Sequence, residues 1–400
     1  MGCCQKKRKR LSLLKRTNEN DDEKNDEPDS EEMLIKLTFE DFIPIKLLGR
    51  GSFGQVILVR LKNNNKLYAM KILDKALLKE RHQELHTQTE RDLLVKVKCP
   101  FIVNIKSAFQ DIKYLYIVSD FMQGGDMYFH MHAAKRFDFQ LTQFFISEIV
   151  LALEYLHKQN MVYRDLKPEN ILLDAKGHIK LTDFGLSKIL SSSKDKAFTI
   201  CGTKQYLAPE IFMNKGYEKT IDWWSLACLT YEMLTGNLPF PIKRDTKINM
   251  DIYKRQIQFP RYMNEDARDL ISKMLVIDPK KRLGCGKNDI VKIKNHPFFE
   301  EINWDEIWNK EIVPPFEPDL KDELDLKYFD TQFTDEPVES FIKNPRSREV
   351  SYEYNNFTYV TDSVKNELLT MPKESNEDNK ENNENKENKE NKENKENKEN

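Results

Sequence analysis

The sequence YRDLKPEN at residues 163–170 is followed by DFG at residues 183–185. Together the two stretches supply a candidate proton acceptor, Asp165, and two candidate metal ligands, Asn170 and Asp183. Phosphoryl transfer to a hydroxyl group needs such a set. One carboxylate orients the attacking oxygen, and oxygen ligands hold the ions that neutralise the phosphates. The two motifs therefore indicate phosphoryl-transfer chemistry.

A glycine-rich motif, GRGSFGQV, precedes these residues at 49–56. Glycines allow a backbone to close over phosphate groups without clashes from Cβ atoms. A dinucleotide-binding fold is the alternative interpretation, but it requires a helix directly after the glycines. The β-branched and apolar run at 56–59 predicts a strand there instead, which favours a phosphate-covering hairpin.

Lys71 lies within the predicted strand that begins at residue 67, in the sequence YAMK. This position corresponds to the lysine that binds the α- and β-phosphates in the Val-Ala-Ile-Lys motif. Such a lysine needs an acidic partner on the next helix, which is predicted at 83–96. By its spacing Glu90 is expected to be that partner, and Asp92 is the alternative.

The order of the predicted elements indicates an α+β protein. Strands predominate up to residue 72, whereas helices are predicted at 141–158 and 223–234. A small β-rich lobe is therefore expected before a larger α-helical lobe. The expected divisions are a basic N-terminus at 1–16, an acidic linker at 17–38, a folded domain at 42–299, a Phe-rich tail at 300–361 that lies on the domain, and disordered Asn-Lys-Glu repeats at 373–400.

The composition argues against several classes of protein. The net charge of the 400 residues is −2, so the strong basic field of a nucleic-acid-binding protein is missing. The six cysteines are scattered without metal-ligand spacing, which indicates a reducing, cytoplasmic setting. No apolar run approaches the roughly 18 residues of a membrane span, and no secretory signal is predicted. We expect a monomer that does not bind nucleic acid.

In order and spacing, these motifs make the region from Phe42 to Phe299 resemble a eukaryotic protein kinase. DLKPEN, together with GT at 202–203 and YLAPE at 206–210, resembles serine/threonine rather than tyrosine kinases. Tyr163 before Arg-Asp, TICGT at 199–203 and the Phe-rich tail are similar to the AGC group, nearest to its protein kinase B and ribosomal-kinase branch. The implied fold is the bilobal protein kinase fold with an AGC-type C-terminal tail.

The resemblance implies ATP and Mg²⁺ as cofactors and assigns catalytic roles. Asp165 receives or orients the substrate hydroxyl proton, Lys167 steadies the transferred phosphate, and Asn170 and Asp183 bind magnesium. It also implies structural roles, with Glu210 paired to Arg282 and Asp222 bracing the catalytic loop. The residues expected around the nucleotide are Gly49, Gly51, Ser52, Gly54, Val56, Ala69, Lys71, Glu90, Asp120, Met122, Asp126, Glu169 and Phe329.

Regulation and substrate choice are also implied by the group. Thr199 and Thr358 are expected phosphorylation sites, and Ser340 fits the turn-motif position loosely, because Phe341 follows where proline is usual. A phosphoinositide-dependent-kinase-like enzyme is the expected activator at Thr199. The side chains expected to bind that phosphate are His86, Arg164 and Lys188. The acids expected to select protein substrates with arginines upstream of Ser or Thr are Asp126, Glu169 and Glu232.

The N-terminus begins like a lipidated segment. Gly2 is a candidate for myristate, with Cys3 and Cys4 as palmitate sites, although Lys6 replaces the usual Ser or Thr. The basic run at 6–10 would add attraction to an anionic leaflet. A nuclear-localisation cluster is the alternative. We expect the cytoplasmic face of a membrane.

Two other functions fit the sequence less well than an active kinase. A catalytically inactive kinase fold that serves as a scaffold predicts the loss of Lys71, Asp165, Asn170 or Asp183, but all four are present. A nucleotide-dependent oxidoreductase would need a helix after the glycines and a second dinucleotide signature.

Overall fold

The computed structural model describes residues 36–190, 196–213, 216–242, 250–286, 289–342 and 354–370. The predicted N-terminal segment at 1–16, with its candidate lipidation sites Gly2, Cys3 and Cys4, lies outside the described residues. So do most of the predicted linker and the repeats at 373–400.

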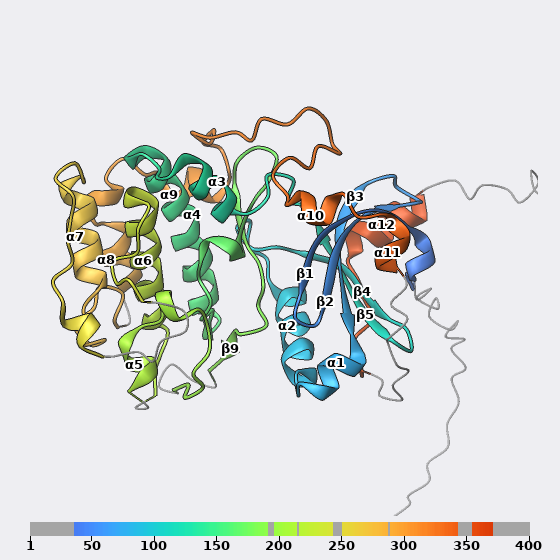
Figure 1. The fold of residues 1–400 in the computed structure, drawn as a ribbon, viewed down its shortest axis with the longest axis horizontal. Helices are drawn as coiled ribbons and strands as arrows, with labels where there is room; N and C mark the ends of the chain where they lie inside the picture. Colours follow the sequence, from blue (N-terminus) through green and yellow to red (C-terminus); the bar gives the residue numbers. More distant parts are fainter. Residues whose placement is uncertain are drawn as a thin grey trace, which may run out of the picture. The chain divides into compact units, whose positions relative to one another are not determined.

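An antiparallel sheet of six strands forms the first part of the fold (Figure 1). The hairpin predicted at 45–59 is present, with Gly51 opposite Gly54 at its turn. The last strand is contributed by the C-terminal tail. In the order in which they neighbour one another, the strands are β1 (Phe42–Gly51), β2 (Gly54–Leu61), β3 (Leu67–Asp74), β5 (Tyr114–Asp120), β4 (Ile105–Gln110) and β10 (Tyr359–Val360).

Two helices follow β3. Asp74 begins the first, α1 (Lys75–Glu80), because its carboxylate accepts hydrogen bonds from the main-chain N–H groups of the first turn. The second, α2 (Glu84–Lys96), is the helix predicted at 83–96. It buries Leu93 and Leu94 in the larger hydrophobic core, and its charged residues Glu90 and Arg91 are buried as well.

The helical part of the fold is built around α4 (Phe139–Lys158) and α6 (Thr220–Thr235). The apolar residues at helical spacing in α4, Phe145, Ile149, Leu153 and Leu156, are fully buried, and so is Trp224 of α6. The fold class predicted from the sequence is therefore confirmed. The other helices are α3 (Met127–Ala134), α5 (Pro209–Phe212), α7 (Glu265–Met274), α8 (Asp289–Lys294), α9 (Trp304–Trp308), α10 (Thr331–Thr334), α11 (Val338–Ile342) and α12 (Asp362–Thr370).

Helix α4 is long and apolar enough to cross a membrane, with a mean hydropathy of 1.2, although no apolar run of that length was expected. However, 72% of the apolar window is buried inside the protein. The apolar residues of α4 therefore serve as the core of the helical part.

The motifs YRDLKPEN and DFG lie in loops between short strands. The loop with YRDLKPEN connects β6 (Met161–Val162) to β7 (Ile171–Leu173), and DFG connects β8 (Ile179–Leu181) to β9 (Lys188–Ile189). Strand β6 pairs with β9 and β7 pairs with β8, so the two loops are anchored side by side. Short 3-10 helices lie at Phe39–Asp41, Pro168–Asn170, Lys204–Tyr206, Met250–Lys254 and Pro297–Phe299.

The tail after residue 300 is more ordered than the sequence indicated. No periodicity was detected there, yet it contains α9, α10, α11 and β10. These elements are too short to show a helical or strand period. The expectation that its aromatic rings are covered holds for Phe316, Phe329, Phe333 and Phe357, each of which is buried or half-buried.

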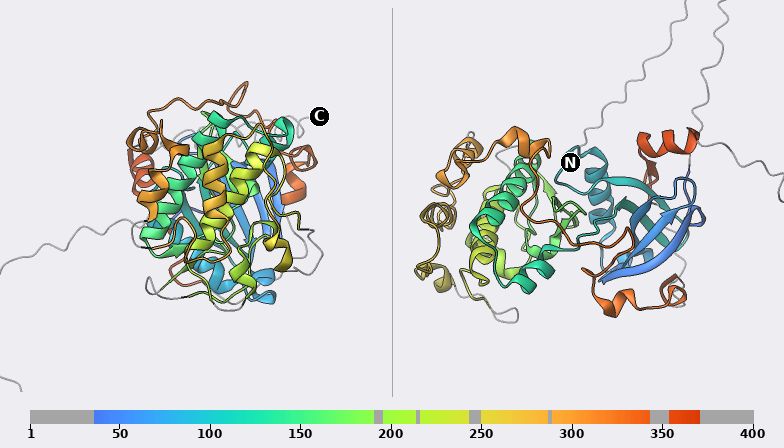
Figure 2. Two further views of the ribbon diagram at one scale, coloured as in Figure 1. Left: turned by 90° about the vertical axis from the view of Figure 1, so that its left-hand side faces the viewer. Right: turned by 90° about the horizontal axis from the view of Figure 1, so that it is seen from above.

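The folded part also extends beyond its expected boundaries at both ends. Leu37, assigned to the acidic linker, is buried in the hydrophobic cluster of the sheet. After the tail, α12 forms over residues for which no structure was predicted, and its Val364 joins the same cluster. In the view from above in Figure 2, the orange α10–α11 segment and the red α12 lie on different sides of the blue strands. The tail therefore contacts both edges of the sheet, β1 through α10 and α11, and β4 through β10.

Candidate active site

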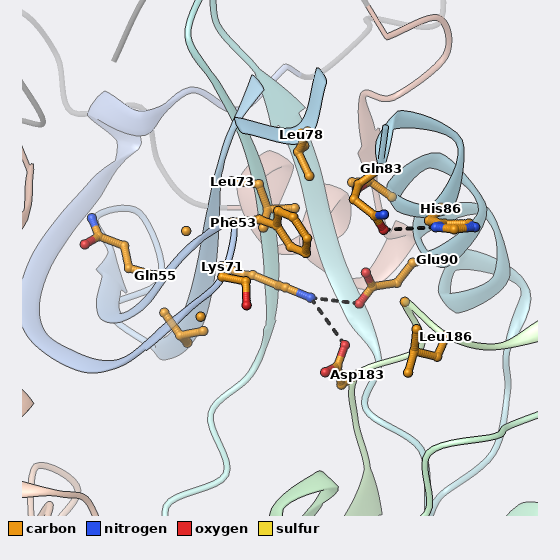
Figure 3. A pocket seen from close by; sticks show the side chains of 16 residues that line it. Phe53, Gln55, Lys71, Leu73, Leu78, Gln83, His86, Glu90, Asp183 and Leu186 are labelled. Atoms are coloured by element: carbon orange, nitrogen blue, oxygen red, sulfur yellow. Dashed lines mark hydrogen bonds and ion pairs between the residues drawn. The ribbon is translucent and has the colours of Figure 1, made fainter. Parts of the chain in front are cut away.

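Lys71 lies at the centre of a network of charged side chains between β3 and α2 (Figure 3). Its Nζ is 2.9 Å from Oε1 of Glu90 and 3.9 Å from Oδ1 of Asp183. Burial by itself lowers the pKa of Lys71, but the two carboxylates outweigh burial and raise the pKa above its ordinary value. Lys71 is therefore held as a cation, which is the state needed to bind phosphate oxygens.

The alternative partner, Asp92, is turned toward its own helix. Its Oδ1 accepts hydrogen bonds from Arg91 at 2.8 Å and from Gln88 at 3.1 Å. Residues two positions apart on a helix point in different directions, so only one of the two acids can face Lys71. The observed partner is Glu90.

The glycine turn between β1 and β2 borders a cavity of about 320 Å³, a size found in small-molecule sites. The turn residues 51–56 line this cavity together with Lys71, Glu90 and Asp183. A Cβ at Gly51 would meet no atom within 4 Å, whereas a Cβ at Gly54 would lie 1.8 Å from the carbonyl oxygen of Ile72. Gly54 is thus required for packing on β3, and Gly51 leaves space beside the backbone for a ligand.

The residues expected at the other end of the nucleotide site lie on β3, on β5 and just after β5. Ala69 lies on β3 opposite β5, and Met122 is buried. The carboxylate of Asp120 lies 2.8 Å from Nζ of Lys180 and 2.9 Å from Nζ of Lys106. Burial raises the pKa of Asp120, but the two lysines outweigh burial and lower it. Because this side chain is engaged by lysines, the main chain of Asp120 is the part that remains for a ligand.

Phe329 of the tail lies against the same segment. Its ring stacks on Phe121, with centroids 5.8 Å apart. Nε2 of Gln123 also donates hydrogen bonds to the main-chain oxygens of Asp322 and Asp325, at 2.5 and 3.2 Å. The tail therefore follows the chain that connects β5 to α3.

Asp222 of α6 supports the loop that carries Asp165. Its carboxylate, which is fully buried, accepts main-chain hydrogen bonds from Tyr163 at 3.0 Å and from Arg164 at 2.9 Å. Arg164 has a φ of 72°, a left-handed conformation that residues with a Cβ seldom adopt. The strained backbone persists because the surrounding residues hold it. Asp222 therefore braces this loop, as the resemblance implied.

Asp165 is positioned through both of its carboxylate oxygens. Oδ2 accepts a hydrogen bond from Nδ2 of Asn170 at 2.8 Å and lies 3.0 Å from Nζ of Lys167. Oδ1 accepts hydrogen bonds from the main-chain N and the Oγ1 of Thr203, both at 3.1 Å. The contact with Thr203 was not predicted. It ties the segment after DFG to the residue expected to accept the proton, and so orients that residue.

Asn170 and Asp183 supply the donor atoms that magnesium prefers. Nδ2 of Asn170 donates to Asp165, which leaves the amide oxygen of Asn170 as a ligand. Asp183 has a φ of 57° and lines the cavity, with 54% of its side chain exposed. Mg²⁺ typically takes one or two carboxylates and completes its shell with phosphates and water. The described residues accordingly contain no group of three or more metal-binding His, Cys, Asp or Glu side chains.

The structure connects Thr199 to only one of its three predicted phosphate ligands. Nη1 of Arg164 donates to the Tyr217 hydroxyl at 3.1 Å, and this hydroxyl donates to the main-chain oxygen of Thr199 at 2.6 Å. Within the described part of the chain, no hydrogen bond or ion pair joins Thr199 to His86 or Lys188. His86 instead contacts Gln83 at 2.9 Å. Tyr217 is thus a link that sequence reasoning missed.

The three acids predicted to select the substrate influence one another electrostatically. Burial raises the pKa of Asp126 and of Glu232, and the negative charge of Glu169 raises both further. Asp126 also accepts the first hydrogen bond of α3, from the N–H of Phe129, and Glu232 accepts one from the hydroxyl of Tyr206. Like charges gathered in this way favour the binding of a cation.

Glu210 and Arg282 form a buried bidentate ion pair, as the resemblance implied. The two guanidinium nitrogens lie 2.6 and 2.9 Å from the carboxylate oxygens. The main-chain oxygens of Thr220 and Val276 accept the remaining hydrogen bonds of Arg282, and its guanidinium lies over Trp224 at 5.1 Å. With its charge and donors satisfied, Arg282 joins the first turn of α5 to the start of α6 inside the helical part.

The tail segment around Thr358 is docked against α2 and β4. Phe357 is fully buried and Tyr354 is nearly so, with their rings 5.9 Å apart. Nε of Arg91 donates to the main-chain oxygen of Phe357 at 3.1 Å, and Nη2 donates to that of Thr358 at 3.2 Å. Arg91 directly follows Glu90, and its role was not predicted. The side chain of Thr358 itself is exposed.

Another part of the tail contacts the glycine motif. Arg50 lies between Gly49 and Gly51, and its guanidinium is 2.5 and 2.7 Å from the two carboxylate oxygens of Glu336. The hydroxyl of Ser340 donates to the same carboxylate at 3.1 Å. The predicted phosphorylation site Ser340 is therefore exposed and adjacent to the anchor between tail and glycine turn.

The chain matches two protein families. Residues 42–299 match the protein kinase domain, and residues 320–359 match the protein kinase C terminal domain. The serine/threonine-protein kinase YPK2/YKR2 of Saccharomyces cerevisiae is 42% identical over 327 residues, which cover 82% of this chain and 48% of that protein. Serine/threonine-protein kinase Sgk1 of Xenopus tropicalis is 43% identical over 303 residues, which cover 76% of this chain and 72% of that protein. Several of the matched relatives, YPK2/YKR2 among them, are about twice as long as the region they share with this chain.

Proposed function

Since this chain belongs to the protein kinase family, and within it to the AGC group, we propose that it transfers the γ-phosphate of ATP to serine or threonine residues of proteins. The observation that carries this proposal is the assembled pair of Lys71 and Glu90, with Asp183 beside it. An ion pair between this lysine and the helix that follows is required for phosphoryl transfer in protein kinases.

In the proposed reaction Lys71 binds the α- and β-phosphates and the glycine turn covers them. Asp165 accepts a hydrogen bond from the substrate hydroxyl and receives its proton as the phosphate moves, while Lys167 stabilises the transferred group. Asn170 and Asp183 would hold Mg²⁺, which neutralises phosphate charge when bound. Thr203 keeps the carboxylate of Asp165 in place.

We propose basic protein substrates, because Asp126, Glu169 and Glu232 gather negative charge. The test is phosphate transfer from ATP to a peptide with Arg-x-Arg-x-x-Ser and to the same peptide with both arginines replaced by alanine. Preference for the arginine peptide is expected. Equal transfer to both peptides would contradict the arginine preference alone. No transfer to either or to a generic protein substrate, with Thr199 phosphorylated and magnesium present, would count against the activity.

The affinity for an arginine peptide should fall as the pH is lowered. The pKa values of Asp126 and Glu232 are raised, so both carboxylates are fully charged only above those pKa values. As the pH falls, they bind protons at a higher pH than ordinary carboxyl groups do. Each lost carboxylate–guanidinium pair should raise the KM for the peptide roughly tenfold, because a charged hydrogen bond contributes about 1.5 kcal/mol or more. KM measured against pH for the Glu232→Gln variant should show a smaller change. Identical pH profiles for the two proteins would contradict this assignment.

The contact between Arg50 and Glu336 should tighten the binding of ATP. Arg50→Ala is expected to raise the KM for ATP about two- to fivefold with little change in kcat, because the pair is bidentate but exposed to solvent. Arg60→Ala is the matched control. Arg60 pairs with Glu323 of the tail at 2.8 Å but lies on β2, away from the glycine turn. Equal effects of the two substitutions on KM would show that the glycine turn is not involved.

We propose regulation by phosphorylation at Thr199 and Thr358, with a phosphoinositide-dependent-kinase-like enzyme as the activator at Thr199. The exposed side chains of both residues support this proposal. A phosphate on Thr199 would lie near Arg164, because the Tyr217 hydroxyl contacts both Arg164 and the main chain of Thr199. Thr199→Ala should prevent activation by such a kinase. If this variant is activated as well as the parent, the role of Thr199 is excluded.

We also propose that acylation of Gly2, Cys3 and Cys4 brings the chain to the cytoplasmic face of a membrane, because one myristoyl chain alone binds weakly and the palmitates and basic run add the second signal. Mass spectrometry of the protein purified from its own cells tests this directly. Unmodified Gly2, Cys3 and Cys4 would exclude it.

A further inference from the structure

Helix α12 and the strand before it anchor the segment around Thr358 from its C-terminal side. We name residues 359–370 the C-terminal clasp. Tyr359 and Val360 extend the sheet by pairing with Ala108 and Ser107 of β4, and the N–H of Thr361 donates to the main-chain oxygen of Lys106 at 2.9 Å. Strand addition of this kind is held by main-chain hydrogen bonds, so it requires no particular side chain at Thr358.

The helix of the clasp adds apolar contacts with the sheet. Val364 is 3% exposed and belongs to the hydrophobic cluster that contains Phe109 and Tyr116, and Leu368 packs against that cluster. Leu369, the next residue, is 58% exposed. The helix therefore has a defined buried face, which an incidental tail helix would lack.

The far end of the clasp is fixed by polar contacts with the turn between β2 and β3. Oε1 of Glu367 lies 2.7 Å from Nζ of Lys66, and Oε2 accepts a hydrogen bond from Nδ2 of Asn64 at 2.7 Å. The same amide of Asn64 donates to the hydroxyl of Tyr68 at 2.9 Å. The clasp thus spans from the β4 edge of the sheet to the β2–β3 turn.

The residues held by the clasp are those that contact α2. Phe357 and Thr358 immediately precede it, and their main-chain oxygens accept the hydrogen bonds of Arg91. The guanidinium of Arg91 also lies 5.5 Å from the ring centroid of Tyr359, which is part of the clasp. Arg91 adjoins Glu90, so the contacts of the clasp lie one residue away from the pair between Glu90 and Lys71. None of these contacts uses the side chain of Thr358.

We infer that Val364 and Glu367 are positioning residues, which keep the Phe357 segment docked and Glu90 on Lys71 without a phosphate on Thr358. This inference rests on the proposed kinase activity and deepens its regulation. A phosphate on Thr358 adds to a docking that the clasp already secures. Activity then depends strongly on that phosphate only when the clasp is broken.

The test compares four full-length proteins phosphorylated at Thr199: the parent, Thr358→Ala, Val364→Asp, and the double variant. We expect Thr358→Ala to keep kcat within about threefold of the parent, and the double variant to lose tenfold or more. Val364→Asp should regain activity when Thr358 is phosphorylated. Leu369→Asp is the matched control, because it places the same charge on the exposed face of the same helix, and its kcat should equal that of the parent. Equal losses in Thr358→Ala and in the double variant would overturn the inference.

Hydrogen exchange of the main-chain amides in α2 and in residues 354–358 gives a second readout that does not need activity. Val364→Asp should speed exchange at both places, and Leu369→Asp should not. Glu367→Lys should speed exchange at the same places, but less than Val364→Asp does. Adding Lys66→Glu to Glu367→Lys should restore slow exchange, because the ion pair re-forms with its charges exchanged. If Val364→Asp and Leu369→Asp exchange alike, the clasp does not hold the segment. If exchange changes as expected but the parent transfers no phosphate, the proposed function fails while the clasp stands.

Discussion

Replacing Asp165 with asparagine should lower kcat by about 10²- to 10⁴-fold, the range contributed by a positioned general base. The substitution keeps the shape of the side chain but removes its capacity to take a proton. It also weakens the contact with Nζ of Lys167, which lies 3.0 Å from Oδ2 of Asp165. The KM for ATP should change little, because Lys71 and Glu90 are untouched.

The measurement is the steady-state rate of phosphate transfer to the arginine peptide, together with the thermal unfolding of each protein. Asp138→Asn is the matched control, because Asp138 caps α4 by accepting a hydrogen bond from the N–H of Leu141 at 2.8 Å. Asparagine caps a helix as well as aspartate does, so this variant should be fully active. A kcat for Asp165→Asn within a few fold of the parent would remove Asp165 from the proposed mechanism.

Replacing Arg282 with leucine should destabilise the helical part by about 3–5 kcal/mol. The side chain of Arg282 has no exposed surface, and its removal leaves the carboxylate of Glu210 buried without its cation. The main-chain oxygens of Thr220 and Val276 also lose their donors. At roughly 2–4 °C for each kcal/mol, the expected fall in Tm is about 6–20 °C.

Differential scanning calorimetry of the parent and three variants checks this prediction. Arg282→Lys keeps a charge but not the bidentate geometry, so its Tm should lie between those of the parent and Arg282→Leu. Lys254→Ala breaks an exposed pair with Asp251 and should leave the Tm close to that of the parent. A Tm for Arg282→Leu equal to that of Lys254→Ala would contradict the role given to the buried pair.

Local sequence patterns were sufficient for the parts of the site that lie within one supersecondary unit. The glycine hairpin follows from glycines flanked by β-branched residues, and the partner of Lys71 follows from the helical spacing that separates Glu90 from Asp92. The burial of α4 likewise follows from an apolar stripe with a period of 3.6 residues. In each case the residues that decide the outcome are near one another in the chain.

The same patterns could not identify the long-range supports of the site. Thr203 contacts Asp165 from a different loop, and Arg91 contacts carbonyl oxygens of the tail. A lone arginine or threonine carries no local signature for such a contact. Within the described residues, the predicted phosphate ligands His86 and Lys188 do not contact the unphosphorylated Thr199, so their binding of a phosphate there stays a prediction.

The sequence by itself therefore predicted the chemistry, because Lys71, Asp165, Asn170 and Asp183 occur within short motifs that carry their own context. Tertiary structure alone decided how that chemistry is held in place. The clasp shows why: α12 has few apolar residues and no clear period, and its buried face exists only once β4 and the β2–β3 turn are in position. A motif is defined by neighbouring residues, whereas an anchor is defined by two surfaces that meet after the chain has folded.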